Sequence, residues 1–383
     1  MATSTDAYWL ALRRVSGVGA RVARMLLEKF GEAPRIFAQG EEELVAAGVY
    51  KPTARNIARF AEFEELEKEL CELARLGVSL VRWNDENYPA NLRQIPDPPP
   101  FLYLRGSLPV GERDCVAIVG ARAASDAALH MAHRLGLEFA IKRIAVISGL
   151  ARGIDAQAHR GTLEGNGRTI AVLGCGIDII YPPEHRNLAE TIIAQGGALL
   201  SEVPLGSAPA PENFPVRNRL IAGMSLGVVV VEAAEKSGSL ITARLALEQN
   251  RQVFAVPGSP LTGKTRGSNR LLKEGARLVD CVEDVIEDLA PQLTNAAPSA
   301  PPLASAAPAR PAPPSNQRNL QDNREKQFQT VLEHLSASER IHVDSIVESS
   351  GLNAQTVLGV LLELELNGVV AQHPGKLFSL AQI

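Results

Sequence analysis

The stretch Val116–Arg122, VAIVGAR, joins the pattern of a buried strand to a turn that could bind a phosphate. A dinucleotide-binding turn reads G-x-G-x-x-G, and its second glycine lets the backbone approach a pyrophosphate. Gly120 holds the first glycine position, but Arg122 and Ser125 hold the other two. Because the arginine fills the space of a pyrophosphate and adds positive charge at a helix N-terminus, the turn predicts phosphate binding but not NAD binding.

Six short apolar runs follow one another through the middle of the chain and alternate with helical patterns. Their residues are largely β-branched and nearly continuous in hydrophobicity, which is typical of strands buried on both faces. Helices between such strands predict parallel βαβ units, and therefore an α/β fold with an extended Rossmann-like, doubly wound sheet. The predicted strands are Val116–Val119, Ile144–Ile147, Thr169–Leu173, Ala198–Ser201, Val228–Val231 and Val253–Val256.

Small and polar residues gather where these strands end or where the next helix begins. In a doubly wound sheet, ligands bind beyond the carboxyl ends of the strands. Five such loops on one edge, several of them carrying arginines, predict an anion-binding site there. The candidate residues are Gly120, Arg122, Ser148, Gly149, Arg152, Gly153, His185, Arg186, Asn187, Arg217, Asn218, Arg219, Ser237, Gly238, Ser239 and Thr242.

Some of these residues allow other interpretations. Asp155 could brace its own helix, or pair with Arg152 or Arg217, instead of acting as a base. Ser148, Asp155 and His159 have the residue types of a hydrolytic triad. However, Ser148 lacks a G-x-S-x-G elbow, and the other two lie four residues apart on one predicted helix. We therefore expect no triad chemistry.

His130 and His133 lie one helical turn apart, but no carboxylate or cysteine partner suggests a metal site. We predict no metal and no cofactor. The chain has 383 residues, 45% of them hydrophobic, and a formal net charge of −4. This mildly acidic composition excludes a body coated in positive charge, so any nucleic-acid contact has to be a local basic site.

The sequence has no apolar run long enough to cross a membrane, and its first residues lack the pattern of a signal peptide. The four cysteines are far apart and form no C-x-x-C pair. Free thiols of this kind are typical of a reducing compartment. We therefore expect a cytoplasmic protein without membrane insertion.

Composition divides the chain into four zones. Residues 1–77 predict an N-terminal helical domain, and residues 78–290 the extended Rossmann-like domain, which begins with a strand and a proline-rich extended crossing that ends in FLYLRG. Residues 291–322 are rich in Ala, Pro and Ser and predict a flexible linker. Residues 323–383 predict three helices and then a hairpin, which is the winged-helix pattern.

The N-terminal zone contains a helix, a Gly-x-Gly turn at Gly17–Gly19 and a second helix. This spacing is similar to a helix-hairpin-helix, whose turn can present N–H groups to a DNA phosphate. A weaker copy lies at Leu44–Phe60. A helical bundle with glycine turns and no DNA contact is the alternative interpretation.

The motifs of residues 80–285 together resemble the bacterial DNA-processing protein A family (DprA, also called Smf). In chain order they are VAIVGAR, ISGLARGIDAQAH, TIAVLGCGIDIIYPPEHRNL, LLSEVPLG, NFPVRNRLIAG, VVVVEAAEKSGSLITARLALEQNRQVFAVPGS and GSNRLLKEGA. The flanking zones fit the resemblance too, because such proteins often carry an N-terminal sterile-alpha-motif-like domain and a C-terminal winged helix.

The resemblance implies a non-enzymatic protein that binds single-stranded DNA, protects incoming transforming DNA and helps load the RecA recombinase. It also implies a homodimer, with contacts near the segment Gly267–Leu278, where we expect Asn269, Leu271, Leu272 and Leu278 to contribute. The family's DNA-gripping positions correspond to Arg122 and, in the YPPEHRNL loop, to Arg186. Because aromatic residues make up only 4% of the chain, we expect phosphate contacts to outweigh base stacking.

Two other functions stay open. One is a nucleoside-phosphate-binding hydrolase on a related Rossmann-like fold, for which Glu232 is the best single carboxylate. The other is a regulator that binds double-stranded DNA through the winged helix. The predicted recognition helix, NAQTVLGVLLELELNGV, carries Glu363 and Glu365 but no Arg or Lys. Such a helix fits a major groove poorly, so we favour a protein-contact or accessory role for this domain.

Overall fold

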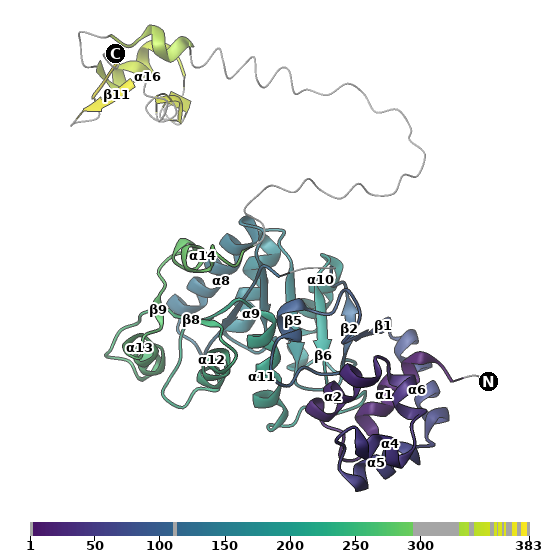
Figure 1. Cartoon of the computed structure of the whole chain (residues 1–383). Helices are drawn as coiled ribbons and strands as arrows, with labels where there is room; N and C mark the ends of the chain where they lie inside the picture. Colours follow the sequence, from purple (N-terminus) through teal and green to yellow (C-terminus); the bar gives the residue numbers. More distant parts are fainter. Residues whose placement is uncertain are drawn as a thin grey trace, which may run out of the picture. The chain divides into compact units, whose positions relative to one another are not determined.

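The computed structural model of the chain describes residues 3–109, 113–293, 329–336 and 341–352, with shorter stretches between 356 and 380. The chain divides into two compact units, Met1–Ala300 and Pro301–Ile383 (Figure 1). Among the residues described, no helix is both long and apolar enough to span a membrane. The boundaries predicted at residues 77, 290 and 322 stay predictions, and residues 294–322 of the proposed linker lie outside the described part.

A nine-stranded sheet with the order β1-β2-β6-β5-β4-β3-β7-β8-β9 forms the centre of the larger unit. Neighbouring strands from β6 across to β9 are parallel. All six predicted strands are confirmed, as is the doubly wound α/β fold. Their bounds are Cys115–Val119 (β3), Ala145–Ser148 (β4), Thr169–Leu173 (β5), Ala198–Ser201 (β6), Gly227–Val230 (β7) and Gln252–Ala255 (β8), and the short β9 is Arg277–Leu278.

Two antiparallel strands extend the sheet beyond β6. Strand β1 (Val78–Arg82) pairs with β2 (Phe101–Gly106), and β2 pairs with β6. The proline-rich crossing was predicted to be extended throughout. Its end is extended, as the paired strand β2, but Ala90–Arg93 within it form the short helix α7, so that part of the prediction was wrong. The four residues Phe101–Leu104 are buried, and burial on both faces favours a paired strand over a free crossing.

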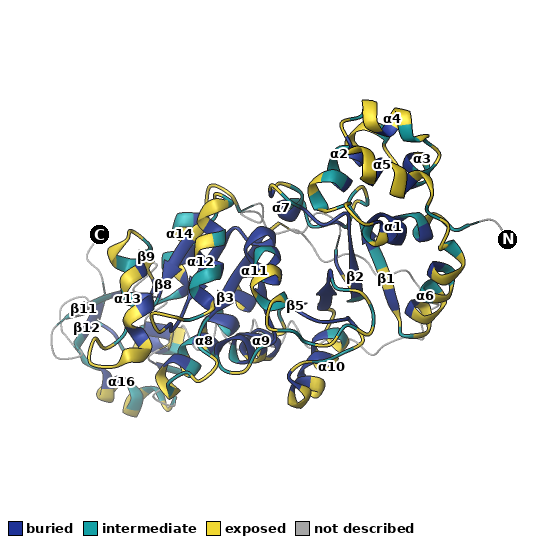
Figure 2. Ribbon diagram, turned by 90° about the horizontal axis from the view of Figure 1, so that it is seen from below, coloured by how far each residue is buried: buried dark blue, intermediate teal, exposed yellow. Residues whose placement is uncertain are grey.

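Helices cover both faces of the sheet, and alternate strand residues point to opposite sides. On one side, Val116 and Ile118 pack with helices α8 (Asp126–Ile141), α9 (Ile154–Glu164) and α14 (Val282–Leu289). On the other side, Ala117 and Val119 pack with a second set of helices. That set is α7 (Ala90–Arg93), α11 (Asn213–Met224), α12 (Ser239–Glu248) and α13 (Arg266–Lys273). Figure 2 shows the central strands as buried, and every residue of β3 to β7 is buried.

Six helices form the N-terminal part, as predicted. They are α1 (Thr5–Arg14), α2 (Ala20–Phe30), α3 (Ala33–Phe37), α4 (Glu41–Ala46), α5 (Lys51–Ala58) and α6 (Phe63–Arg75). Gly17 has a positive φ of 90° in the turn between α1 and α2, and Gly19 is the N-cap of α2. These helices share one apolar cluster with Phe101 and Tyr103 of β2 and with α10 (Arg186–Ala194). Whether the glycine turns contact DNA stays a prediction.

The smaller unit has the winged-helix elements. Residues 329–333 are helical, and helix α16 spans Val343–Ser350. Strands β10 (Ile341–His342), β11 (Val370–His373) and β12 (Leu377–Leu380) form an antiparallel sheet in the order β10-β12-β11. The predicted hairpin and the winged-helix domain are therefore confirmed. Much of the predicted recognition helix, including Glu363 and Glu365, lies outside the described residues.

Helices α8 and α9 approach each other through two glycines, and Figure 1 shows the two helices side by side. An added Cβ on Gly136 would lie 2.4 Å from the carbonyl oxygen of Ala158. On Gly161, it would lie 1.9 Å from the carbonyl oxygen of His133. Any side chain would therefore force these two helices apart. Since each helix follows a strand that ends at the same edge of the sheet, this contact also fixes the relative position of their first turns.

We predict that Gly161→Ala lowers the free energy of unfolding by about 3 kcal/mol, because the new methyl group overpacks against backbone that cannot move cheaply. The measurement is urea unfolding followed by circular dichroism. Gly263→Ala is the matched control, since an added Cβ there meets nothing within 4 Å, and we expect a change below about 0.5 kcal/mol. Equal stability of the two variants would contradict the close packing.

Candidate nucleic-acid interface

The winding of the chain reverses between β3 and β7, which are neighbours in the sheet although three strands separate them in sequence. Helix α8, after β3, packs on one face, and helix α12, after β7, packs on the other. The loops that leave these two strands therefore diverge and leave a crevice at the carboxyl edge. A cleft of about 660 Å³ opens at this position.

Half of the predicted site residues line this cleft. They are Gly120, Arg122, Arg217, Asn218, Ser237, Gly238, Ser239 and Thr242. A smaller hollow, which shares Arg122 with the cleft, is lined by Gly149 and Arg152. The other predicted residues line neither hollow, namely Ser148, Gly153, His185, Arg186, Asn187 and Arg219. The structure therefore brings four of the five predicted loops to one place.

Arg217 forms the floor of the cleft and is only 4% exposed. Its Nη1 donates to the carbonyl oxygen of Gly149 at 3.0 Å and to that of Val172 in β5. Burial lowers the pKa of Arg217 to about 10, while nearby Asp155 opposes this shift, so the guanidinium stays charged at neutral pH. Arg217 thereby connects helix α11 to strand β5 and to the loop that follows β4.

Asp155 supplies the opposite charge. Its Oδ2 accepts the backbone N–H of Gly149 at 3.0 Å and that of Ala151 at 3.4 Å. Burial raises the pKa of this carboxyl group, whereas Arg217 and the two N–H groups lower it. The structure thus agrees with the bracing interpretation of Asp155. Two N–H groups of this loop therefore point inward to the protein's own carboxylate and not outward to a ligand.

A second internal carboxylate holds the first turn of α8. Glu232 is 2% exposed, and its Oε2 accepts the hydroxyl of Ser125 at 2.6 Å while Oε1 accepts the Ser125 N–H at 3.0 Å. An anion of the protein itself therefore occupies the place at this helix N-terminus where the sequence pattern suggested a ligand phosphate. What remains for a ligand at this turn is the exposed side chain of Arg122.

Two aromatic residues line the cleft that sequence reasoning did not include. The ring centroids of Tyr181 and Phe214 lie 5.7 Å apart, and the guanidinium carbon of Arg122 lies 5.4 Å from the centroid of Phe214. Tyr181 is 37% exposed. Both stand in motifs that the sequence analysis had selected, YPPEHRNL and NFPVRNR. The low aromatic content predicted few aromatic rings, but it could not show that two of them would lie together in the cleft.

Exposed positive charge at the cleft comes from Arg122 and Lys236, and the latter was also missed. In the described part of the chain neither residue makes an ion pair. Arg152, in the smaller hollow, differs because it is paired with Glu184, and this contact raises the pKa of Arg152. Of the predicted arginines, Arg122 is therefore the best placed to meet a phosphate inside the cleft.

Arg219 and Ser148 have structural partners elsewhere. Arg219 lies on α11 but forms ion pairs with Asp97 and Glu202, and its side chain is 12% exposed. Ser148 is fully buried and donates its hydroxyl to the carbonyl oxygen of Ile118 at 2.6 Å. Both were predicted to line the site because they stand in the polar clusters at the sheet edge, but neighbouring positions on a helix or strand face different ways.

The YPPEHRNL loop also contains one buried residue with a structural role and two exposed residues. His185 is buried, and its Nδ1 lies 2.8 Å from the carbonyl oxygen of Leu150. Arg186 and Asn187 are exposed at the start of α10, beyond Tyr181. Gly153 has a φ of 76°, and an added Cβ would lie 2.3 Å from the carbonyl oxygen of Ala121. His185 and Gly153 therefore hold the loops together, and Arg186 stays exposed outside the cleft.

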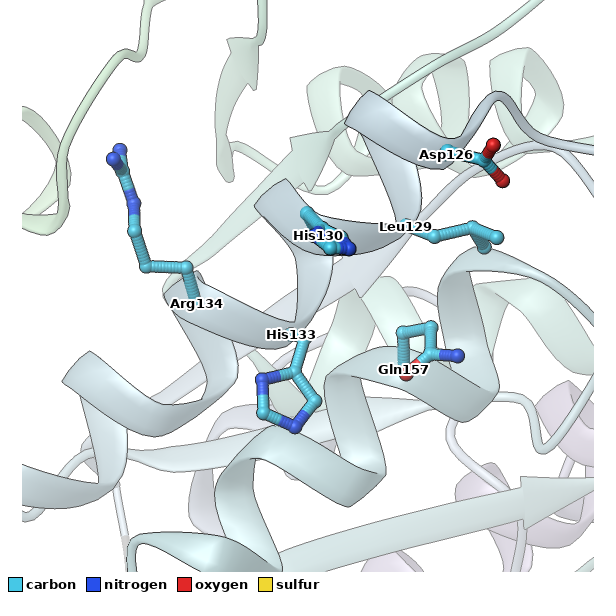
Figure 3. A pocket seen from close by; sticks show the side chains of 6 residues that line it. All are labelled: Asp126, Leu129, His130, His133, Arg134 and Gln157. Carbon is cyan, nitrogen blue, oxygen red and sulfur yellow. The ribbon is translucent and has the colours of Figure 1, made fainter.

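A second hollow, of about 590 Å³, lies on the outer surface of helices α8 and α9 (Figure 3). His130 and His133 stand one turn apart on α8, and Gln157 approaches from α9. Nε2 of His133 lies 3.1 Å from a carboxylate oxygen of Glu164. The lining of this hollow gathers no set of like charges, so the cleft is the better candidate for a ligand site.

The four predicted dimer residues differ in exposure. Leu278 is 52% exposed on β9, and Leu272 is partly buried. Leu271 is 8% exposed and packs in the core beneath α13. The side chain of Asn269 donates to the carbonyl oxygen of Gly258 at 2.9 Å and accepts its N–H at 3.0 Å. Of this set, Leu272 and Leu278 are the residues that a second copy could reach.

The fold defines a doubly wound α/β protein with a cleft lined by exposed basic side chains at the point where the winding of the chain reverses. Comparison with known families adds two matches. The family "DNA recombination-mediator protein A" matches residues 79–290, and the "DprA winged helix domain" matches residues 296–376. The chain therefore belongs to the DNA recombination-mediator protein A family, DprA/Smf, which confirms the resemblance seen in its sequence.

Relatives agree with this assignment. Protein Smf of Synechocystis is 35% identical over 98% of this chain and 98% of its own length. The DNA processing protein DprA of Streptococcus pneumoniae is 42% identical over 53% of this chain and 72% of its own length. The X-ray structure of DprA from S. pneumoniae superposes with a TM-score of 0.64 at 32% identity, covering 74% of this chain and 97% of that one.

We predict that Arg217→Met lowers the free energy of unfolding by about 3–5 kcal/mol at neutral pH, because Asp155 is then buried without its opposite charge. Adding Asp155→Asn should recover part of this loss, since no unpaired charge remains. A double-mutant cycle by urea unfolding measures the coupling. Strictly additive losses would show that the two side chains do not depend on each other.

A third prediction concerns acid stability. His159 is fully buried, its Nδ1 lies 2.7 Å from the hydroxyl of Thr169, and burial lowers its pKa to about 3. The unfolded chain, with a histidine pKa near 6.5, therefore binds a proton between about pH 6.5 and 3 that the folded chain does not. Stability contributed by neutral His159 is present above pH 6.5 and is lost as the pH falls through this window.

Urea unfolding at pH values between about 6.5 and 4 tests this, with His159→Gln as the comparison. We expect the free energy of unfolding to fall less steeply with acid in the variant than in the wild type, by up to about 1.4 kcal/mol per pH unit. His130→Gln is the control, because His130 is exposed. Parallel pH profiles for the wild type and His159→Gln would contradict the prediction.

Proposed function

We propose that the cleft binds single-stranded DNA, and that the protein acts in DNA processing without catalysing a reaction. The observation that carries the proposal is the combination of unpaired positive charge and aromatic rings in one hollow. Arg122 and Lys236 can meet phosphates, while Tyr181 and Phe214 offer faces for a base. Proteins that hold single strands without strong sequence preference use this combination of groups.

The same features favour a single strand over a duplex. In a duplex the bases are stacked and paired, so a base cannot stack on an aromatic ring of the protein without leaving the helix. The ring pair lines the cleft together with Gly120, Gly238 and Pro211. A single strand can place a base there at little cost. The protein's formal charge of −4 also fits a short local contact better than a broad electrostatic surface.

Three finer parts of the proposal rest on the family. DprA proteins are named for DNA processing, and we propose the same role here, with protection of incoming transforming DNA and loading of RecA as its purpose. We also propose a homodimer, to which Leu272 and Leu278 contribute. A dimer would place two clefts on one strand and raise the avidity through effective concentration. The site of action proposed is the cytoplasm.

The hydrolase alternative depended on Glu232 as its best candidate residue, and this residue has a structural role. Glu232, the best carboxylate for attack on a glycosidic bond, holds the Ser125 hydroxyl and N–H from a buried position. Asp155 is similarly engaged with Gly149, Ala151 and the charge of Arg217. Incubation with nucleoside monophosphates and a search for free base would reveal such an activity. The duplex regulator stays a second alternative, which the binding experiment below addresses.

We predict that Arg122→Glu weakens binding to fluorescent oligo-dT by about 30-fold or more at low salt, because it replaces an attraction to phosphate with a repulsion. Fluorescence anisotropy measures the affinity, and unfolding curves establish that the variant is folded. Arg59→Glu, an exposed arginine of the N-terminal helices, is the control for the change in net charge. A duplex of equal length should bind more weakly than oligo-dT. Wild-type affinity in folded Arg122→Glu would refute the proposed site.

A further inference from the structure

We infer that the single strand continues past the cleft onto a second basic subsite, formed by Lys264 in the loop after β8 and Arg266 at the start of α13, with Lys236 between the cleft and this subsite. This inference rests on the proposed function of the cleft. Its ligand is the phosphate backbone of the same DNA strand. Lys264 and Arg266 line neither the cleft nor the smaller hollow beside it, so they would contact the strand only where it has left the cleft.

The loop after β8 belongs to the same edge as the cleft. Strand β8 pairs in parallel with β7, so both loops leave the sheet in the same direction. The N–H groups of Gly267 and Ser268 both donate to the carbonyl oxygen of Ala233, at 2.7 Å and 3.2 Å. An added Cβ on Gly267 would lie 2.6 Å from the carbonyl oxygen of Ala234. The start of α13 is therefore held directly against the loop that carries Lys236.

Internal hydrogen bonds keep this loop in place. The hydroxyl of Thr265 donates to the carbonyl oxygen of Ser259 at 2.6 Å. The Asn269 side chain bonds both the N–H and the carbonyl group of Gly258. Lys264 and Arg266 thus extend from a backbone that is already ordered. A phosphate contact there would cost side-chain entropy, but little backbone entropy.

The distribution of ion pairs also singles out these cations. Arg244, Arg270 and Arg277, on neighbouring elements, are each paired with an acidic residue. Lys236, Lys264 and Arg266 are exposed and make no ion pair within the described ranges. The acidic residue adjacent to them in sequence is Glu235, which is also exposed. Within the described ranges, the exposed cations beside the cleft are therefore without ion pairs, whereas these three neighbouring arginines are paired.

A strand that crosses both places would contact phosphates in succession. The ring pair of Tyr181 and Phe214, together with Arg122, would hold one stretch of the strand. Lys236 would contact the strand where it leaves the cleft. Lys264 and Arg266 would then hold the next phosphates. Very short oligonucleotides would fill the cleft alone, and longer ones would gain the second subsite. Each extra phosphate contact steepens the salt dependence of single-strand binding by about 0.7 in the slope of log K against log salt.

The test is the double variant Lys264→Ala/Arg266→Ala, assayed with oligo-dT of about 4 and about 16 nucleotides over a range of salt concentrations. We expect the short oligonucleotide to bind as it does to the wild type. The long one should bind about 5- to 10-fold more weakly at low salt, with a slope reduced by about 1.4, because two phosphate contacts are lost. Lys273→Ala, an exposed lysine at the far end of α13, is the control.

A charge-preserving variant, Lys264→Arg/Arg266→Lys, separates charge from shape and should bind the long oligonucleotide as the wild type does. Light scattering establishes that all variants keep the wild-type mass, because α13 is also close to the proposed dimer contacts. Wild-type affinity and slope in the alanine variant would overturn the second subsite, and so would equal weakening by both double variants. Failure of the cleft itself looks different, since Arg122→Glu would then leave the binding of both oligonucleotides unchanged.

Discussion

The carboxyl edge of the sheet depends on the buried charges of Arg217 and Asp155. Gly149 lies between them, because its carbonyl group accepts from Arg217 while its N–H donates to Asp155. A Cβ on Gly149 would lie 2.6 Å from the guanidinium, so a larger residue there would displace the Arg217 side chain. These two side chains hold the loop after β4 to helix α11 and to the first turn of α9. Phe214 also packs on the guanidinium, so Arg217 helps to position the ring pair of Tyr181 and Phe214 as well.

A related constraint explains how the site differs from a dinucleotide site. A dinucleotide fold offers N–H groups of its first turn to a pyrophosphate. Here Glu232 takes the N–H of Ser125, Asp155 takes those of Gly149 and Ala151, and Asp178 takes that of Gly206 at 3.0 Å. These carboxylates hold the loops in place without a ligand. The exposed side chains are then the groups that are left to contact one. A flexible cation suits a polymer whose phosphates arrive in varied positions, whereas fixed N–H groups suit one small molecule.

Much of the fold follows from local sequence. The six core strands, the helix that begins at Ser239 and the turn at Gly120 could be predicted, because buried parallel strands and their glycine turns have strong patterns. The sequence could not show which loop residues face the cleft and which ones hold the loops together. Arg217 and Arg219 are two residues apart on one helix, yet one lies beneath the cleft and the other binds Asp97 and Glu202. Which arginine is free depends on acidic partners far away in sequence, and no local pattern contains them.

The small size of the cleft bears on how the protein could hold DNA at all. Two exposed cations and two rings provide few contacts, and each exposed charge contributes little in water. Affinity therefore has to come from repetition along a strand. A polymer supplies this without new chemistry, since each further contact becomes intramolecular once the first has formed. A basic extension beside the cleft and a second cleft in a dimer act by this same principle. They differ in scale, because one lengthens the contact within a chain and the other joins two chains on the same strand.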